Sequence, residues 1–594
     1  MRDFLAMTAL HEFWDQTKPM LFLGEWCKPY HKKSVWEKYD GELLEHPDLF
    51  HIQSCEAYTY TIHIYQKLLP EIVKWLNKIH QSQYSQKYWR IIVGPFLLWY
   101  IQVVYDRYLY LKYAYILYPR LATIGLEKKS YQTPINTFEF YSFATESDGW
   151  NLQLFTQILE CNFNVPLSYR PYSFQEELHQ RKEIVGKVFN YKRITKIKIK
   201  ICQYMTRLRA SKSIGIYFCG LSNKHLYRLL LNSKFKIFPV IQIENGEKVT
   251  FRDNNPNLTL RNEITQLNAE DEFSKLVLQT LKFNMPLNMI EYYQEESSRA
   301  SKCFPYQPGA IIAAGWNAND QLKFWGAMCA ERGSKLADIQ HGGGYGTHLY
   351  SSREYLERQN CDAFISWGWG NGSDVIPAPS ILICEKKLQH EKNTYQVKNK
   401  ETILWVANET PRYLVSIDNS LHQLERAYFD MQYQFATKLE HPILQQVVMR
   451  IRPCSRNEAL LRYHLPHLKI YTPEDKDSFF DQLSASKIFI SDNLQTTFLY
   501  ALAFNIPTVV FSRDSMRYIN DEAQPYFNAL MQTGIYHDSP LAAANHLNHI
   551  AQDPLIWWQR HDVQKAREDF CYMFSRATPN WLHEWNELLL KFKP

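Results

Sequence analysis

The chain has 594 residues, of which 45% are hydrophobic and 22% are charged. This composition is typical of a globular protein and excludes a disordered chain, a collagen or a small disulfide scaffold. With 67 Lys and Arg against 61 Asp and Glu, the net charge of +6 is too small to indicate a nucleic-acid-binding protein. At about 150 residues per domain, we expect two to four domains.

The sequence shows no pattern typical of a signal peptide, a membrane-spanning helix or a zinc site. The first residues break their apolar run with charges too early for a signal peptide. The longest apolar stretch, Ile91–Val104, is too short to span a bilayer and predicts a buried helix. Eleven Cys residues without zinc spacing favour free thiols and a cytoplasmic protein. The basic run Lys192–Lys200 is typical of an exposed strand, or alternatively of a surface that faces an anionic membrane.

The first part of the chain predicts mostly helices. Met20–Cys27 is an apolar run between prolines and predicts a buried strand. Ala57–His80 and Tyr88–Tyr118 have helical spacing and are rich in Tyr, Trp and Leu. Short β-rich runs then follow at Ser213–Cys219 and Phe235–Ile243.

From residue 309 onward, strands and helices alternate, as in parallel sheets with helical crossovers. Ala310–Ala314, Leu336–Gln340 and Ala363–Trp367 predict strands, and Asn319–Arg332 predicts a helix that ends at Gly333. The polar stretch Cys384–Glu401 predicts a surface linker. Beyond it, further strands are predicted at Thr402–Ala407, Val447–Ile451, Leu468–Tyr471, Lys487–Ile490 and Thr508–Phe511, with helices at Tyr413–Leu439, Ser478–Ser484, Gln495–Phe504 and within 540–593.

This rhythm predicts an α/β fold of two doubly wound, Rossmann-type domains with a helical N-terminal elaboration. We predict an N-terminal α/β domain over residues 1–383 that carries a helical insertion at about 57–119. The linker occupies residues 384–401, and a C-terminal α/β domain with closing C-terminal helices occupies residues 402–594. Ligands of such sheets bind beyond the carboxyl ends of the strands, so residues at these ends are the functional candidates.

The first candidate is the turn Gln340–Gly346, which directly follows a predicted strand. The glycines, among them Gly342, Gly343 and Gly344, allow a sharp turn and a close approach to a donor ligand. His341 stands at the strand end, where a proton-transfer group or a phosphate partner belongs. An incidental histidine in a glycine-rich turn is the alternative.

Two further segments suit phosphate binding. Ser491, Asn493, Thr496 and Thr497 lie between a predicted strand and a helix N-terminus, which favours anions. Helix capping is the alternative interpretation, and it is compatible with binding. Arg452, at the end of the strand 447–451, could hold a phosphate with both arms of its guanidinium, or it could form a salt bridge at the strand end.

Two acidic or mixed segments remain. Glu25 lies among apolar residues at the end of the first predicted strand, so it is either an acid/base group or a capping residue. Glu409 and Arg412 follow the strand 402–407, and this segment either caps a helix or faces the interdomain cleft. No residues with metal-ligand spacing are found. The D-x-D sequence Asp475–Asp477 lies away from any strand end, so we predict no metal requirement.

The order of these motifs resembles that of the two-domain GT-B transferases that use cytidine nucleotides. The matching pieces are Q-H-G at 340–342, D-x-F-x-S-x-G at 362–368, T-P-R at 410–412, R-P at 452–453 and S-D-N-x-x-T-T at 491–497. Arg452 stands where those enzymes carry a histidine, and Thr496 and Thr497 replace serines. The segments Leu23–Cys27, Tyr88–Pro95 and Tyr105–Tyr108 are similar to transferases of O-antigen and capsule gene clusters, a group that includes pseudaminic acid transferases.

The resemblance implies a metal-independent glycosyltransferase without a cofactor. Its donor would be a CMP-activated nonulosonic acid, and its acceptor a growing glycan or lipid-linked oligosaccharide at the cytoplasmic face of the membrane. The retaining or inverting course stays open. Glu25 and His341 are the catalytic candidates, with Glu25 on the acceptor side and His341 on the donor side. The alternatives are a CDP-polyol phosphotransferase of surface-polymer synthesis and a non-enzymatic glycan-binding or export component.

Overall fold

The computed structural model describes most of the chain, including every predicted site residue. The described ranges are 3–44, 53–175, 213–217, 220–242, 255–394, 401–409, 411–418, 425–452, 455, 457–473, 478–513 and 515–592. The basic run Lys192–Lys200 and the D-x-D sequence Asp475–Asp477 lie outside these ranges.

The first 175 residues form an N-terminal unit with strands of its own. Strands β1 (Phe4–Ala6), β2 (Met20–Phe22) and β3 (Gly41–Leu43) are parallel, and β4 (Thr123–Leu126) pairs with β5 (Leu167–Arg170). A bridge between Phe4 and Ala122 joins the two groups. The sequence predicted a single strand here, so a separate sheet in this unit is a finding of the tertiary structure.

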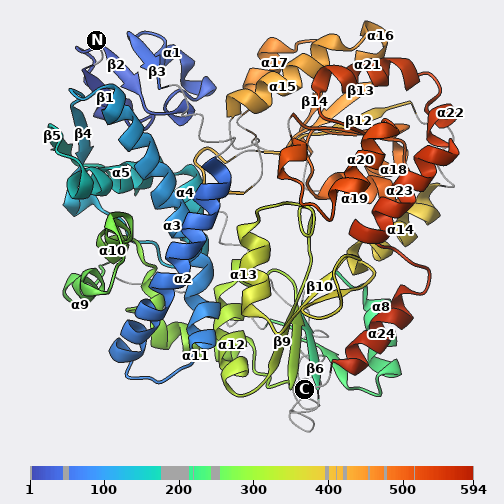
Figure 1. The fold of residues 1–594 in the computed structure, drawn as a ribbon, viewed down its shortest axis with the longest axis horizontal. Coiled ribbons are helices and arrows are strands. Elements are labelled where there is room, and N and C mark those ends of the chain that lie inside the picture. Colours follow the sequence, from blue (N-terminus) through green and yellow to red (C-terminus); the bar gives the residue numbers. More distant parts are fainter. Residues whose placement is uncertain are drawn as a thin grey trace.

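Long helices fill this unit, as the aromatic-rich spacing predicted. They are α2 (Gln53–Ile79) and α3 (Gln86–Leu117), with α4 (Thr137–Glu146) and α5 (Asp148–Asn162) beside them (Figure 1). Helices α9 (Leu258–Arg261), α10 (Glu272–Asn284) and α11 (Tyr293–Cys303), from later in the chain, lie next to this unit. The apolar stretch within α3 is buried, which confirms that it is a core helix. No helix in the described ranges is long and apolar enough to cross a bilayer.

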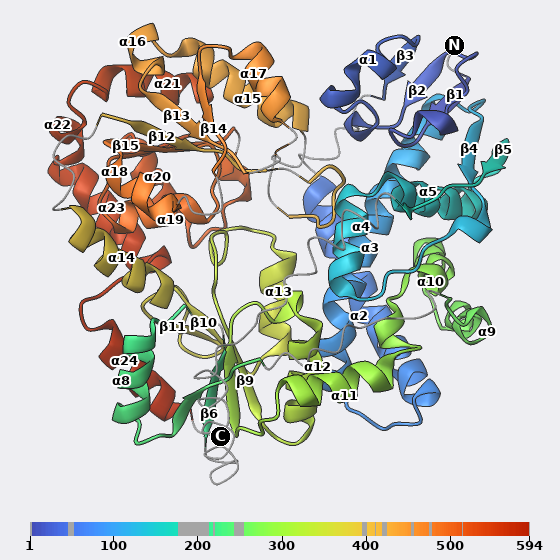
Figure 2. The same cartoon turned by 180° about the vertical axis from the view of Figure 1, so that it is seen from behind.

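A six-stranded parallel sheet forms the middle of the molecule. It contains β6 (Ile214–Tyr217), β7 (Ile237–Pro239), β8 (Ala310–Ala313), β9 (Lys335–Ile339), β10 (Ala363–Ser366) and β11 (Val375–Pro377), in the order β11-β10-β9-β8-β6-β7. Short runs of Ala and Ile suit these strands because both faces are covered. Helices α12 (Asp320–Glu331) and α13 (Ser352–Asn360) lie on one side, and α8 (Asn223–Asn232) lies on the other (Figures 1 and 2).

The C-terminal sheet is also six-stranded and parallel. It contains β12 (Ile403–Val406), β13 (Val447–Arg450), β14 (Lys469–Tyr471), β15 (Ile488–Ser491), β16 (Thr508–Phe511) and β17 (Tyr536–His537), in the order β14-β13-β12-β15-β16-β17. The strand order reverses between β12 and β15, and ligands of such sheets bind beyond that point. The two sheets confirm the predicted GT-B-like pair of Rossmann-type units.

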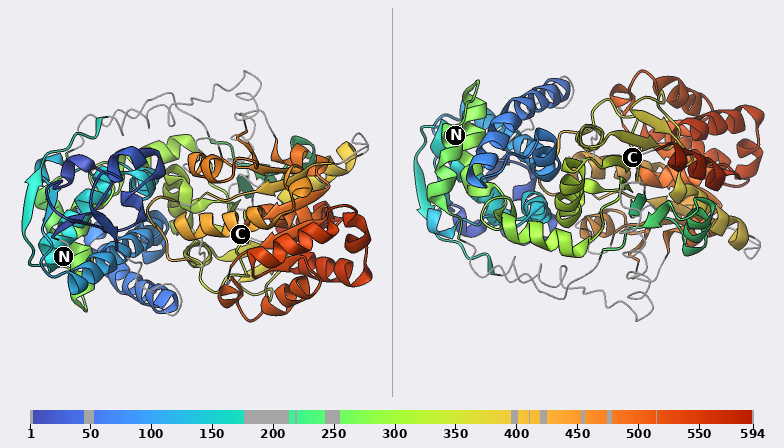
Figure 3. Two further views of the ribbon diagram at one scale, coloured as in Figure 1. Left: turned by 90° about the horizontal axis from the view of Figure 1, so that it is seen from above. Right: turned by 90° about the horizontal axis from the view of Figure 1, so that it is seen from below.

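Helices of the C-terminal unit cover its sheet and return to the middle one. They are α15 (Glu425–Lys438), α16 (His441–Leu444), α17 (Glu458–His464), α18 (Phe479–Ala485), α19 (Thr496–Ala503), α20 (Gln524–Gln532), α21 (Pro540–Ile550), α22 (Pro554–Trp558), α23 (His561–Phe574) and α24 (Trp581–Lys591). In α24, the indole of Trp585 donates to the carbonyl of Pro379 at 2.7 Å. The N-terminal unit and the C-terminal helices lie at opposite ends of the molecule (Figure 3).

Three predicted elements differ from the structure. The first predicted strand ends at Phe22, and Glu25 begins a 3-10 turn because Trp26 and Cys27 bond back to carbonyls of residues 6 and 7. The predicted linker begins as helix α14 (Ile381–Thr394), whose buried His390 bonds Ser484. Residues 413–418, where a helix was predicted to open, are not helical, and the described helix α15 spans Glu425–Lys438. The domain boundaries themselves stay a prediction.

Residues 413–418 stay out of a helix for a physical reason. The N–H of Tyr413 donates to the carbonyl of Thr145, at 3.1 Å, and the N–H of Ile417 donates to the side chain of Gln102, also at 3.1 Å. Both partners belong to the N-terminal unit, so these backbone groups are withdrawn from a helix. Residues 411–418 instead connect the N-terminal unit to the C-terminal one.

Candidate active site

The glycine-rich turn after β9 is held by the buried side chain of Gln340. Its amide oxygen accepts hydrogen bonds from the backbone N–H of Trp367 (2.9 Å) and the indole N–H of Trp369 (2.8 Å). Its amide nitrogen donates to the carbonyl of Gly342 at 2.9 Å. Gln340 thereby fixes the start of the turn against the end of β10 and leaves His341 at the carboxyl edge of the sheet.

This turn contacts the N-terminus of α19 on the C-terminal sheet. The N–H of Gly343 donates to Oγ1 of Thr496 at 2.9 Å. A Cβ atom on Gly343 would lie 2.5 Å from the backbone of Gln495, and one on Gly342 would lie 3.1 Å from Thr496 Oγ1. Gly344 has a φ of +86°, which favours glycine. Two motifs about 150 residues apart in the sequence are therefore neighbours in space, as their predicted strand-end positions required.

The following residues extend the same contact. The side-chain nitrogen of Asn520 donates to the carbonyl of Gly346 (3.0 Å), and its backbone N–H donates to that of Thr347 (2.9 Å). The N–H of Leu349 donates to the carbonyl of Tyr518 at 2.7 Å. Residues 342–349 of the middle unit thus lie directly on the C-terminal unit.

The N-terminus of α19 suits an anion. No side-chain hydrogen bond caps this helix among the described residues, and Thr497, in its first turn, is half-buried. First-turn N–H groups carry partial positive charge and attract phosphate or carboxylate groups. Thr496 keeps a backbone N–H here, while its hydroxyl is occupied by Gly343.

Ser491 and Asn493, predicted to contact phosphate, bond within their own loop. Both are buried, with Ser491 Oγ donating to the carbonyl of Asn493 at 2.8 Å and Asn493 Oδ1 accepting from the N–H of Gln495 at 3.1 Å. Between them, the buried Asp492 accepts hydrogen bonds from Trp405, Tyr428, Gln432 and Asn493. Burial raises the pKa of its carboxyl. This segment shapes the loop and turns its side chains away from a ligand.

Arg452 and Glu409 lie together at the ends of neighbouring strands. The side chain of Arg452 is 71% exposed, and its nearest guanidinium nitrogen lies 3.9 Å from a carboxylate oxygen of Glu409. An exposed pair at this distance contributes little to stability. Arg452 is therefore available to a ligand, with Glu409 as its resting partner.

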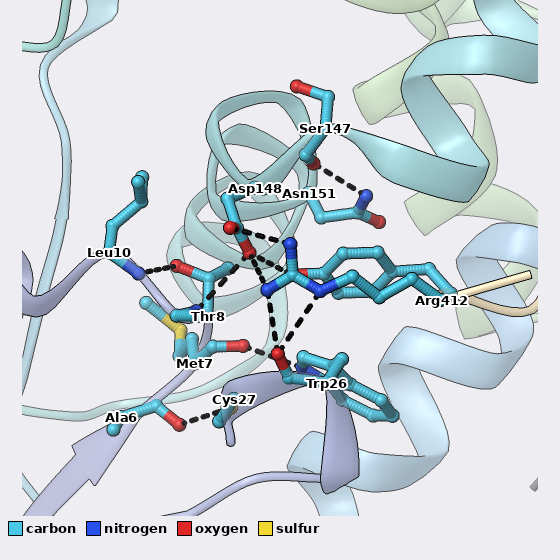
Figure 4. A network of polar contacts seen from close by, with 12 residues as sticks. Ala6, Met7, Thr8, Leu10, Trp26, Cys27, Ser147, Asp148, Asn151 and Arg412 are labelled. Carbon is cyan, nitrogen blue, oxygen red and sulfur yellow. Dashed lines mark hydrogen bonds and ion pairs between the residues drawn. The ribbon is translucent and has the colours of Figure 1, made fainter. Parts of the chain in front are cut away.

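Arg412, predicted as a donor or cleft residue, is buried and bonded within the protein. Its guanidinium donates to both carboxylate oxygens of Asp148, at 2.7 and 2.8 Å, and to the carbonyl of Trp26. Tyr413 and the N–H of Ala9 also donate to Asp148. Figure 4 shows this network, which joins α5, the 3-10 turn Glu25–Cys27 and residues 411–418. All three guanidinium nitrogens of Arg412 donate hydrogen bonds within the protein, to Asp148 or to the carbonyl of Trp26.

Glu25 faces the first turn of α15. Its Oε2 accepts a hydrogen bond from the N–H of Arg426 at 2.9 Å. A carboxylate in this position satisfies an amide that lacks a helical partner and interacts favourably with the helix dipole. This favours the capping interpretation of Glu25 over the acid/base one.

His341 is half-buried and surrounded by ionisable groups. Burial and the positive charge of Arg353 lower the pKa of its imidazole to about 4, so the ring is neutral at pH 7. The hydroxyl of Tyr345 lies 3.4 Å from Nε2 of His341 and donates to the carboxylate of Glu357 at 2.9 Å. A neutral imidazole retains a nitrogen that can accept a proton.

Asp338 and Glu357 are buried carboxylates beneath His341 that the sequence analysis missed. Ligand atoms of the three residues lie within 4.8 Å of one another, so among the described residues they are the group that could hold a metal ion. Burial raises the pKa of both carboxyl groups, that of Glu357 to about 8. Protonation is therefore an alternative to a metal ion as the means of neutralising these two carboxylates. Asp338 lies inside a strand and Glu357 inside a helix, so no local spacing connects them.

Comparison with known proteins identifies related sequences and folds. The model of the LIC12162 family of transferases matches residues 3–589. No curated protein matches the chain. Three solved structures are similar to it. They are the wall teichoic acid polymerase TagF (12% identity, 70% of this chain, 96% of that chain, TM-score 0.33), UDP-GlcNAc 2-epimerase from Methanocaldococcus jannaschii (11%, 64%, 99%, 0.34) and sucrose-phosphate synthase from Thermosynechococcus elongatus (12%, 64%, 98%, 0.31).

Removing Arg412 is expected to destabilise the protein strongly. Arg412→Ala leaves the buried charge of Asp148 without its guanidinium, a loss of about 3–5 kcal/mol in the free energy of unfolding. Urea unfolding followed by tryptophan fluorescence measures it. Arg426→Ala removes a 70%-exposed arginine that pairs with Asp430 and is expected to cost less than about 1 kcal/mol. Equal effects of the two variants would contradict the structural role of Arg412.

His348 is expected to make stability depend on pH. Burial lowers the pKa of its imidazole to about 4, below the ordinary value of 6.5, so the unfolded chain binds the proton first. Stability contributed by the neutral ring is therefore lost as the pH falls from about 6.5 towards 4, at up to about 1.4 kcal/mol per pH unit.

The free energy of unfolding of His348→Gln, measured between pH 4 and 7, should depend less steeply on pH than that of the wild type. The difference in slope should correspond to one proton fewer taken up on unfolding. His583→Gln changes a histidine whose side chain is 73% exposed and should leave the slope as it is. A wild-type slope in His348→Gln would refute the assignment.

Proposed function

We propose a glycosyltransferase function for this chain, which belongs to the LIC12162 family of transferases. The donor in this proposal is a CMP-activated nonulosonic acid such as pseudaminic acid. The acceptor is a growing capsule or O-antigen glycan. If this glycan is linked to a lipid, the enzyme would act at an anionic membrane surface. The reaction needs no metal ion or cofactor in this proposal.

The observation that carries the proposal is the contact between Gly343 and Thr496. It places the strand-end His341 beside the N-terminus of α19, at the carboxyl ends of both six-stranded sheets. A nucleotide sugar needs these two features together, namely donors for its phosphate and a proton-accepting group near the bond that is made. Each lies on a different sheet, so the donor and the acceptor can approach from different units.

A single phosphate suits this arrangement. The uncapped N-terminus of α19, with Thr497 in its first turn, and the exposed guanidinium of Arg452 supply partial and full positive charge. CMP sugars carry one phosphate, so these groups can balance its charge without a cation. The hydrogen bonds strengthen as negative charge develops on the leaving phosphate.

His341 is the proton acceptor in this proposal, in place of Glu25. The carboxylate of Glu25 accepts the backbone N–H of Arg426, whereas the imidazole of His341 is neutral at pH 7. Tyr345 and Glu357 lie behind the ring and orient it. The ring would accept the proton of the acceptor hydroxyl as a cationic, oxocarbenium-like sugar forms.

Turnover of nucleotide sugars tests the proposal. Purified protein is screened for thermal stabilisation by cytidine, uridine and guanosine nucleotides and then incubated, in the presence of EDTA, with a CMP-nonulosonate and a glycan acceptor. We expect stabilisation by CMP and formation of a glycosidic bond. A phosphodiester product from a CDP-polyol would replace the proposal by a polyol-phosphate transferase. Binding of a glycan without turnover of any donor would replace it by a binding component.

Kinetics of two variants distinguish the roles of His341 and Glu25. His341→Ala is expected to lower kcat by about 10²–10⁴-fold because it removes the proton acceptor. Glu25→Gln retains an oxygen that can accept the Arg426 N–H and is expected to keep most of the activity. Steady-state rates with circular dichroism as a folding control measure both. Collapse of kcat in Glu25→Gln with normal folding would return the base role to Glu25.

A further inference from the structure

Arg353 is an exposed cation on α13 that the sequence analysis did not single out. Within the described part of the chain, no hydrogen bond or ion pair engages its guanidinium. Arg358, one turn further along the same helix, pairs with both Glu354 (3.2 Å) and Asp374 (2.6 Å). Of these two arginines, only Arg358 forms ion pairs with neighbouring carboxylates.

Arg353 lies close to the candidate active site. It precedes Glu357 by four residues on α13, so the two side chains share one face of the helix, and Tyr345 bonds Glu357 and lies 3.4 Å from His341. The charge of Arg353 accordingly lowers the pKa of His341. The charges of Arg353 and Arg452 both act to lower the pKa of Tyr141 on α4, against the larger raising effect of burial. An arginine on α13 and an arginine after β13 are thus placed near one tyrosine of the N-terminal unit. Figures 1 and 2 show α13 between that unit and the C-terminal sheet.

The acids near Arg353 are already hydrogen-bonded to other donors. Glu357 accepts from the hydroxyl of Tyr345 (2.9 Å) and from the amide of Asn317 (3.4 Å). Asp418 accepts from the N–H of Ser352 (2.9 Å) and from the hydroxyl of Ser416 (2.7 Å). Because these carboxylates are held in place by other groups, the guanidinium keeps its donors for a ligand.

We propose that Arg353 binds the carboxylate of an acidic donor sugar, while the N-terminus of α19 and Arg452 bind the phosphate. This inference rests on the proposed function and narrows it to donors that carry two separate anions. A guanidinium matches a carboxylate with two parallel N–H···O bonds, a geometry that lysine cannot reproduce. A neutral sugar or a polyol would leave Arg353 without a partner, so the residue selects between donor classes.

Calorimetry with two probes tests the assignment. CMP carries only the phosphate, and CMP-N-acetylneuraminate adds the carboxylate of a nonulosonic acid. We expect wild-type protein to bind the second probe about tenfold to a hundredfold more tightly. Arg353→Gln should abolish this difference and leave the affinity for CMP unchanged, and Arg353→Lys should recover only part of it. Arg358→Gln is the matched control on the same helix and should behave as wild type.

The possible failures are distinguishable. Equal weakening of both probes in Arg353→Gln would place Arg353 at the phosphate and overturn the inference, as would unchanged binding of both. Wild-type protein that binds CMP but gains nothing from the carboxylate would overturn it while leaving a cytidine donor in place. Failure of wild-type protein to bind any cytidine nucleotide would overturn the proposed function and this inference together. Melting temperatures of all variants control for misfolding.

Discussion

Close backbone contact between the turn after β9 and the N-terminus of α19 is the constraint on which the candidate site depends. Only a residue without a side chain allows Gly343 to reach Thr496, because a Cβ atom would overlap the backbone of Gln495. The contact brings a histidine on one sheet next to an anion-attracting helix end on the other. Without it, neither feature would have the chemical surroundings that a transfer reaction needs.

A second constraint comes from buried charge. The ion pair between Arg412 and Asp148 joins a segment that follows β12 to the N-terminal unit. Two buried charges with satisfied hydrogen bonds tolerate little displacement, because an unpaired member is costly. The N-terminal unit is thereby held against the C-terminal one, and Tyr141 is brought near Arg353 and Arg452. Residues of all three parts of the molecule are thereby brought close together.

Opposite charges are separated by depth around His341. The carboxyl groups of Asp338 and Glu357 are buried beneath it, where burial favours their protonated forms. Arg353 and Arg452 are exposed residues. A ligand that approaches this region therefore meets positive charge first. This arrangement favours anionic ligands and keeps the imidazole neutral.

The sequence by itself determined the local features of this protein. Short apolar runs predicted the strands of both six-stranded sheets except the edge strands β11 and β17, and the motifs after β9 and β15 were correctly placed at strand ends, since these properties depend on neighbouring residues. The tertiary structure decided which side chains are free to act. Arg412 is consumed by Asp148, 264 residues away, and Glu25 by the first turn of α15, whereas Arg353 is left exposed. Such outcomes depend on contacts between distant segments, for which local pattern carries no signal.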